Sequence, residues 1–276
     1  MKLVDTRDLN PSEIILRAGS SPAPGTNLMN HFIFFHGVGI RSRFWDIIVP
    51  KLKNKSIQYS LVDLDFTSLD SAFDSSIESV RQIMREYPER NYILVGHSLG
   101  GLFAIYVAQE LGDALHKLVI VNTGLAPKRV AMKAMQQMQI NRISKFIKKI
   151  AMRMLFSGKL PKWLTRSLYF TDDTPEDVKL ELSKNKVREN RSFLMSHFNS
   201  KSIWNSHLER IHFSGPDNVL SVFGSHDKTT PRRAFMYLVK KLNASYTIYQ
   251  GSGHNDIVTA PKYNDCLLYT SPSPRD

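Results

Sequence analysis

Residues 92–101 read YILVGHSLGG, and this stretch decides the fold class. The four apolar residues before Gly96 predict a short strand, and apolar residues at helical spacing continue from Ser98 to a stop at Gly112. A serine on so sharp a turn needs glycines on both sides, here Gly96 and Gly100, because Cβ atoms there would collide with the neighbouring strand and helix. The pattern therefore predicts a strand, a tight turn and a helix, with Ser98 presented at the top of a sheet as a nucleophile.

Short apolar runs alternate with helical patterns along the rest of the chain. The expected strands are 31–36, 59–64, 92–95, 118–121, 218–223 and 245–249. The apolar residues of the first four are nearly continuous, which predicts strands buried on both faces. Residues 71–87 have apolar positions at helical spacing, and Pro88 ends that helix. This alternation predicts an α/β fold with a mostly parallel, doubly wound sheet and crossover helices.

The stretch from 124 to 217 is too long for a connecting loop, so it predicts an inserted subdomain. We expect an α/β core at 1–124 and 216–265 and a helical cap at 125–215. Methionines recur at helical intervals in the first part of this cap, at 132, 135, 138 and 154. From Lys128 to Arg166 there are 11 basic residues and no acidic one, out of a net charge of +12 for the chain. The excess of positive charge is therefore local, which favours a local partner or surface over a general affinity for polyanions such as nucleic acid.

Length and composition set broad limits. The chain has 276 residues, of which 42% are apolar, a value close to that of ordinary globular proteins. No window approaches about 18 uninterrupted apolar residues, and charges in the first eight residues interrupt the apolar stretch that a secretory signal needs. The expected location is cytoplasmic. The single cysteine, Cys266, excludes an intrachain disulfide and a multi-cysteine metal site.

The last eleven residues, 266–276, read CLLYTSPSPRD. They resemble the translation of a transposon-end adapter used in sequencing libraries. We therefore expect them to be a non-native tail that replaces the end of the last helix, and natural sequence to stop near Asp265. A genuine tail rich in serine and proline is the alternative.

A nucleophilic serine needs a base, and the base needs an orienting carboxylate. His254 follows the last apolar run within Gly-Ser-Gly-His, where small neighbours let the ring approach the serine. Asp227 lies in the turn 224–231, which follows an apolar run and precedes a helix. A helix cap is the structural alternative for this aspartate. The competing position at the end of the preceding strand holds Asn122, whose amide cannot stabilise an imidazolium as a carboxylate does, so Asp227 is preferred.

An acyl-transfer site also needs hydrogen-bond donors for the oxyanion. The turn His-Gly-Val-Gly after the first strong strand places the amide of Val38 next to the crevice, between Gly37 and Gly39. The amide of Leu99 at the start of the helix is the expected second donor. A plain glycine-rich turn is the structural alternative for the first of these.

Taken together, four motifs resemble the α/β-hydrolase fold family. They are H-G-x-G, G-x-S-x-G, G-x-x-D-x-x-x-P and the late G-x-G-H, and the resemblance covers residues 32–265. It implies a serine hydrolase that cleaves a carboxylic ester or thioester through an acyl-enzyme, with Ser98, His254 and Asp227 as the triad. Serine at position 98 argues against the carboxylate attack of haloalkane dehalogenases and epoxide hydrolases. No nucleotide fingerprint, phosphate-binding loop or zinc spacing appears, so no cofactor is expected.

The substrate stays open at this level. A methionine-rich, basic cap favours an apolar acyl group in an anionic surrounding, which could be a lipid surface, an acidic acyl-carrier protein or an anionic substrate. A merely solvated basic face is the structural alternative. A carbon–carbon bond hydrolase of the same fold is the alternative enzyme, and a non-catalytic receptor that retains the triad is the alternative of another class.

Overall fold

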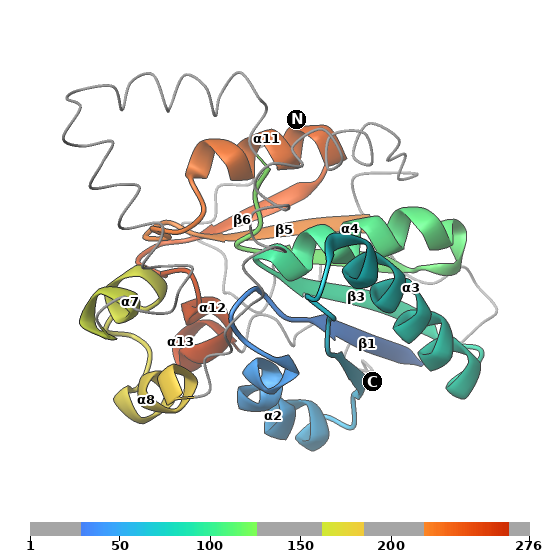
Figure 1. Cartoon of the computed structure of the whole chain (residues 1–276), viewed down its shortest axis with the longest axis horizontal. Helices are drawn as coiled ribbons and strands as arrows, with labels where there is room; N and C mark the ends of the chain where they lie inside the picture. The colour runs from blue at the N-terminus through green and yellow to red at the C-terminus, as the bar shows by residue number, and fades with distance from the viewer. Residues whose placement is uncertain (1–28, 126–161, 185–217, 265–276) are drawn as a thin grey trace, which may run out of the picture.

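A computed structural model describes residues 29–125, 162–184 and 218–264 (Figure 1). Six strands form its centre: β1 (Asn30–Phe35), β2 (Gln58–Val62), β3 (Asn91–His97), β4 (Lys117–Val121), β5 (Val219–Gly224) and β6 (Ser245–Tyr249). The helices are η1 (Ser42–Ile47), α2 (Val49–Asn54), α3 (Leu69–Glu86), α4 (Leu99–Leu111), η2 (Gly112–Ala114), α7 (Lys162–Tyr169), α8 (Glu176–Lys184), α11 (Arg232–Leu242), α12 (Asp256–Thr259) and α13 (Pro261–Asn264).

All six strands form one sheet in the order β2-β1-β3-β4-β5-β6, and every neighbouring pair is parallel. From β1 the chain adds β2 on one side of the sheet and then β3 to β6 in turn on the other side. This is the order of a doubly wound sheet, in which crossover helices cover both faces. Because the strands are parallel, their carboxyl ends lie at one edge of the sheet. The turns after β1, β3, β5 and β6, which hold the motifs singled out in the sequence, therefore meet at that edge.

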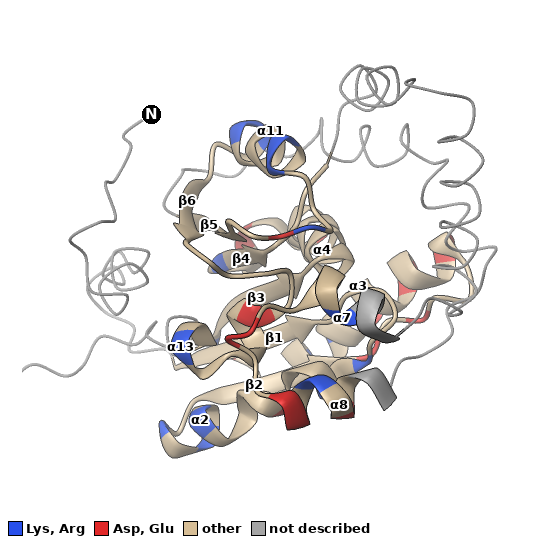
Figure 2. Ribbon diagram, turned by 90° about the vertical axis from the view of Figure 1, so that its left-hand side faces the viewer, with Lys and Arg blue, Asp and Glu red and all other residues tan. Residues whose placement is uncertain are grey.

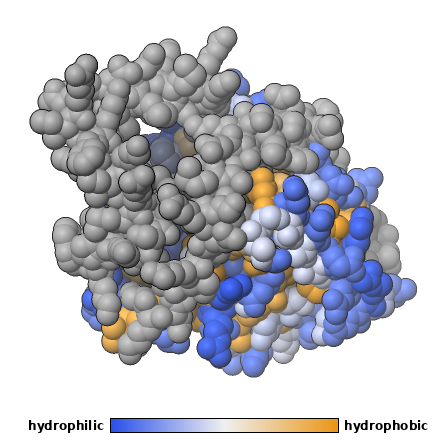
Figure 3. Space-filling view, in the orientation of Figure 1, coloured by the Kyte–Doolittle hydropathy of each residue, from blue (hydrophilic) through white to orange (hydrophobic). Residues whose placement is uncertain are grey.

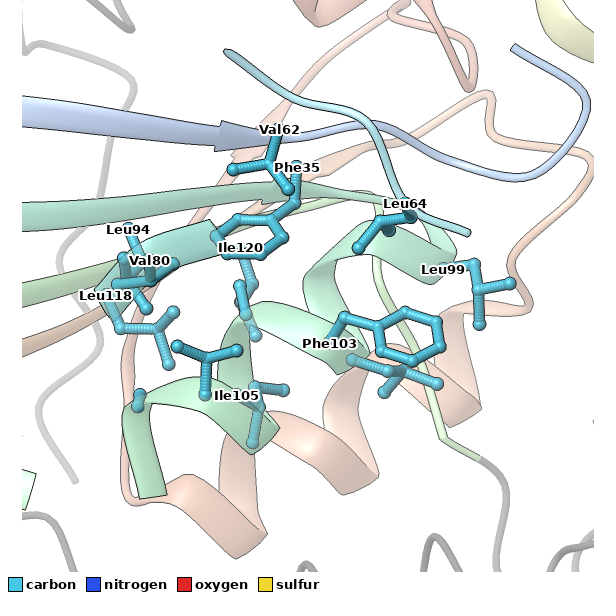
Figure 4. Packing of buried hydrophobic residues seen from close by; sticks show 14 of the residues in the cluster. Phe35, Val62, Leu64, Val80, Leu94, Leu99, Phe103, Ile105, Leu118 and Ile120 are labelled. Atoms are coloured by element: carbon cyan, nitrogen blue, oxygen red, sulfur yellow. The ribbon is translucent and has the colours of Figure 1, made fainter. Parts of the chain in front are cut away.

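Alternate side chains of the strands pack against two separate layers of helices. Ile33 and Phe35 of β1 belong to the core beneath α3 and α4, which Figure 4 shows around Phe103. Phe32 and Phe34 point to the opposite face and pack with η1, α2 and α12. The two faces bury apolar side chains equally well, and this explains why the central strands are apolar throughout.

Helix α3 is amphipathic, with one side in the core and the other exposed to solvent. Its buried residues include Ala72, Phe73 and Val80. The opposite side gives the polar surface seen over this helix in Figure 3. Its exposed charged residues are Asp70, Asp74, Glu78, Arg81 and Arg85. Ser68 caps the helix by accepting a hydrogen bond from the Ser71 amide at 3.0 Å.

The prediction of a parallel, doubly wound sheet is confirmed, and all six expected strands are present within a residue or two of their limits. One expectation is wrong: the strand at 59–64 is not buried on both faces. As β2 it is the edge strand and pairs only with β1, so Gln58 is exposed and the next three residues are half-buried. Its apolar pattern could not reveal this, because edge position depends on the order of the strands.

Residues 162–184 are the described part of the expected cap. They form α7 and α8, which lie beside α12 and α13 near the carboxyl edge of the sheet (Figure 1). This part holds 4 basic and 5 acidic residues, and Figure 2 shows both signs on these two helices. The methionines at 132–154, most of the basic run and the tail at 266–276 lie outside the described residues. The limits 125 and 215 of the cap stay a prediction.

No helix within the described ranges combines the length and the apolar character needed to cross a bilayer.

Candidate active site

Ser98 lies in the turn between β3 and α4, where its backbone adopts φ 55° and ψ −122°. Such a conformation is strained for a residue with a side chain and is typical of a nucleophile elbow. A Cβ on Gly96 would lie 2.5 Å from the Gly101 Cα, and a Cβ on Gly100 would lie 2.3 Å from the carbonyl oxygen of His36. The steric reason given above for these two glycines is therefore seen in the structure.

The structure brings together the three residues expected to form the triad. The Oγ atom of Ser98 lies 3.0 Å from Nε2 of His254, and Nδ1 of His254 lies 2.8 Å from Oδ2 of Asp227. The side chains of His254 and Asp227 are 2% and 0% exposed. Asp227 can only accept when ionised, so Nδ1 carries the proton and Nε2 is free to accept the hydroxyl proton of Ser98.

Asp227 uses its other oxygen for a separate task. Oδ1 accepts hydrogen bonds from the amides of Thr229 at 2.7 Å and Thr230 at 2.8 Å. Helix α11 begins later, with Pro231 as its cap residue. Asp227 thus stabilises the turn of its own motif while facing His254, and the helix-cap alternative does not describe it. These backbone bonds fix the rotation of the carboxylate.

Asn122 links the turn that holds Asp227 to the turn that holds His254. Its Nδ2 group donates to the carbonyl oxygens of His254 at 2.6 Å and Gly253 at 3.2 Å, and its Oδ1 accepts from the Gly224 amide at 2.7 Å. The residue is buried and has a left-handed φ of 48°. An amide suits this position because it both donates and accepts, whereas an ionised carboxylate could not donate to these two carbonyl oxygens. Sequence reasoning treated this position only as a competing acid and missed its bridging role.

His97 also supports the turn 251–254 that holds His254, here called the histidine turn. The motif G-x-S-x-G places no demand on the residue at position 97. It is fully buried, and its Nε2 donates to the carbonyl oxygen of His254 at 2.9 Å. Its Nδ1 has no hydrogen-bond partner within the described part of the chain. Burial, with a further contribution from the neighbouring His254, lowers the pKa of His97 well below its usual value. The ring is therefore a neutral spacer between Phe44 and His254.

The turn after β1 lies against the nucleophile, as expected for the residues that would bind the oxyanion. A Cβ on Gly37 would lie 3.1 Å from the Cβ of Ser98, and Gly39 needs its positive φ of 77°. His36 holds this turn: its Nδ1 donates to the carbonyl oxygen of Gly37 at 2.8 Å, and its Nε2 accepts from the Leu64 amide at 3.1 Å. Burial lowers the pKa of His36, so the ring stays neutral.

A cavity of ≈ 60 Å³ opens beside Ser98. Its walls are mostly apolar and come from the turn after β1 and from the described part of the cap: Val38, Ile40, Tyr169, Phe170 and Leu182. Leu99, the other expected oxyanion donor, is the first residue of α4 directly after Ser98. Tyr169 of α7 and Leu182 of α8 therefore line the cavity beside Ser98.

Comparison with known proteins identifies the family of the chain. Residues 30–257 match the model of the Hydrolase_4 family, described as serine aminopeptidase, S33. The chain belongs to this family of α/β-hydrolases. The fold class expected from the four motifs is thereby confirmed.

Similar proteins carry several names. Human protein ABHD8 is 28% identical over 99 residues, which are 33% of this chain and only 23% of that protein. Pimeloyl-(acyl-carrier protein) methyl ester esterase of Vibrio vulnificus is 24% identical over 234 residues, 83% of this chain and 89% of that one. The monoacylglycerol lipase of Paleococcus ferrophilus superposes with a TM-score of 0.60 at 20% identity, covering 88% of this chain and 95% of that one, and so shares the fold.

The buried residues His36 and His97 predict how stability depends on pH. Their pKa values in the folded state are lowered from about 6.5, so the unfolded chain binds more protons in the acidic range. Their contribution is complete above about pH 6.5 and is lost as the pH falls toward the folded pKa values. Each histidine contributes a slope of up to about 1.4 kcal/mol per pH unit. We expect the melting temperature to fall between pH 7.5 and 5.5.

The variant His97→Gln isolates one of these contributions. Glutamine places an amide nitrogen near the former Nε2 and keeps a donor for the carbonyl oxygen of His254. Its melting temperature should therefore decline less steeply with acid than that of the unchanged protein. Parallel curves for the two proteins would show that His97 does not titrate in this way.

Proposed function

We propose that the protein cleaves carboxylic esters or thioesters of apolar acyl groups, with Ser98 as nucleophile, His254 as base and Asp227 as the orienting acid. The proposal rests on one observation, the continuous path from Ser98 Oγ through His254 to Asp227 at 3.0 and 2.8 Å. These distances are within the hydrogen-bond reach that proton transfer requires.

In the first half-reaction, Ser98 Oγ attacks the carbonyl carbon while its proton passes to Nε2 of His254. The proton then goes to the leaving alcohol or thiol, and the acyl group stays on Ser98. In the second half-reaction, a water molecule gives its proton to Nε2 of His254 as its oxygen attacks the acyl carbon. His254 then returns that proton to Ser98 Oγ as the bond to the acyl carbon breaks and the acid is released. Asp227 holds the ring and stabilises the imidazolium without taking the proton.

The amides of Val38 and Leu99 are proposed to bind the oxyanion that forms at each attack. Two features support this assignment: the turn of Gly37 and Val38 lies against Ser98, and the Leu99 amide belongs to the first turn of α4. Free amides at a helix start carry partial positive charge and favour an anion.

The substrate class follows from the walls of the cavity. Tyr169, Phe170 and Leu182 offer apolar contact, and no cation faces the cavity among its described lining residues. This environment favours an uncharged acyl chain. The relative from Vibrio vulnificus is named for an ester on an acyl-carrier protein. A carrier protein and an anionic lipid surface both fit the basic run at 128–166 as the source of the substrate.

A panel of substrates tests this proposal. We expect p-nitrophenyl esters to be cleaved, with kcat/KM rising from acetate to medium chains because each buried methylene contributes about 0.8 kcal/mol. The same acyl group is then offered on an acyl-carrier protein and on vesicles with anionic or neutral lipids. Preference for one anionic carrier that weakens with salt would identify the source. An aminoacyl p-nitroanilide tests the peptidase activity in the family's description, and cleavage of this amide alone would contradict the proposal.

A further inference from the structure

A second buried aspartate lies two residues after His254. Asp256, the first residue of α12, is 0% exposed. The hydrogen bonds of its carboxylate go to Thr171, Thr174 and Gly253 and not to Ser98 or His254. Its oxygens accept from two amides and two hydroxyls, which fills the sites that a carboxylate offers. The mechanism above does not use this group.

The donors come from two segments that are far apart in the sequence. One is the amide of Gly253, which donates to Oδ2 at 2.7 Å from within the histidine turn. The others belong to the described part of the cap, just after α7. Thr171 donates from its amide at 3.1 Å and from its hydroxyl, and Thr174 donates from its hydroxyl to Oδ1 at 2.7 Å.

Neighbouring contacts hold the same two segments together. The amide of Asn255 donates to the carbonyl oxygen of Tyr169 at 2.8 Å, and the hydroxyl of Tyr263 donates to Asp173 at 2.6 Å. The histidine turn also approaches the cap too closely for a larger residue than glycine. A Cβ on Gly253 would lie 2.9 Å from Asp256 Oδ2 and 3.1 Å from the methyl group of Thr171.

We propose that Asp256 is a positioning residue that fastens the cap loop 171–174 to the backbone of the histidine turn and thereby holds His254 in register with Ser98. This inference rests on the proposed function of His254. The described part of the cap then acts as a fixed wall: Tyr169 and Phe170, directly before the loop, stay in place beside the cavity while substrate enters and leaves.

The physical reason is the chemistry of a buried acceptor. Separation of the loop from the core would leave a carboxylate and several donors without partners in a region closed to water, and each unpaired group is costly. The loop therefore stays attached during turnover. Because Asp256 binds the amide directly before His254, a shift of the loop is transmitted to the imidazole, and a misplacement of about 1 Å can cost on the order of 100-fold in rate.

The test changes the cap side of this contact and leaves the triad and Asp256 intact. In the double variant Thr171→Val and Thr174→Val, both hydroxyl donors are lost while size and backbone are kept. Thr259, which also contacts Thr174, retains its hydrogen bond to the carbonyl oxygen of Asn255. We expect kcat for p-nitrophenyl acetate to fall about 10-fold, with KM within about twofold. Acetate is chosen because so small an acyl group depends little on the cavity wall.

Two further variants separate positioning from stability. Thr171→Ser with Thr174→Ser keeps both hydroxyls, so kcat should return to within about twofold of the unchanged protein. Ser76→Ala removes a buried hydroxyl bond of 2.7 Å within α3, far from the site, and should lower only the melting temperature. Reaction of Ser98 with a fluorophosphonate should slow in the valine variant alone.

The outcomes are distinct. If the valine variant keeps the kcat and the fluorophosphonate rate of the active unchanged protein and loses only thermal stability, as Ser76→Ala does, Asp256 is a structural residue and the inference is wrong. If the unchanged protein neither hydrolyses esters nor reacts with the fluorophosphonate, the proposed function itself falls, and the inference with it.

Discussion

Replacement of Ser98 by alanine should reduce kcat for ester hydrolysis by about 10⁶-fold, to the level left by oxyanion binding alone. A loss of this size is expected because a nucleophile, its base and the orienting acid act as one unit, as in the subtilisin series. KM should change little, since the apolar walls of the cavity stay in place. Steady-state kinetics with a p-nitrophenyl ester measure the effect, and fluorophosphonate labelling should disappear with it.

Ser221→Ala is the matched control. Ser221 is a buried serine on β5, away from the turn that holds Ser98, and its hydroxyl has no hydrogen-bond partner among the residues that the structure describes. Its loss should leave kcat and labelling unchanged. Substantial activity in the Ser98 variant would mean that another residue attacks the ester and would remove the basis of the proposed mechanism.

Asp227→Asn should lower kcat by about 10⁴-fold, and the structure indicates why the amide cannot substitute. The amides of Thr229 and Thr230 donate to Oδ1, so the oxygen of an asparagine would occupy that side. Its NH₂ group would then face Nδ1 of His254 and donate to it. The ring would carry its proton on Nε2, where it could no longer accept the proton of Ser98.

This prediction is measured by kcat across a pH range in which the protein is folded. Asp63→Asn serves as the control, because Asp63 is an exposed carboxylate on the turn after β2 that binds the Ser42 amide at 2.9 Å. It should keep full activity. If the two variants lost activity equally, Asp227 would not be the orienting acid.

Much of the fold and the three central site residues could be predicted from the sequence. The strand, turn and helix around Ser98 are specified by local sterics, since two glycines flank a serine within five residues. The turns of Asp227 and His254 have local patterns as well. In each case the decisive neighbours are close in the chain, so a short pattern suffices.

The supporting residues could not be predicted in the same way. Asn122 and Asp256 bind groups more than 80 residues away in the sequence, the carbonyl oxygen of His254 and the hydroxyl of Thr174. Neither has a local motif, and buried polar residues of this kind look ordinary until the fold places their partners. The one available signal was Asn122 itself, an amide directly after β4 at a position that competes with Asp227 as the place for an acid.

The long excursion between β4 and β5 has a consequence for the order in which the molecule assembles. Val121 pairs with His97, 24 positions away, on one side and with Val222, 101 positions away, on the other. Closing the longer loop costs about 1 kcal/mol more in chain entropy, so contacts on that side should form later during folding. The proposed nucleophile, Ser98, belongs to the half built from nearby segments, and His254 and Asp227 belong to the half that docks last. A nascent chain would thus carry an inert serine until its final strands are in place.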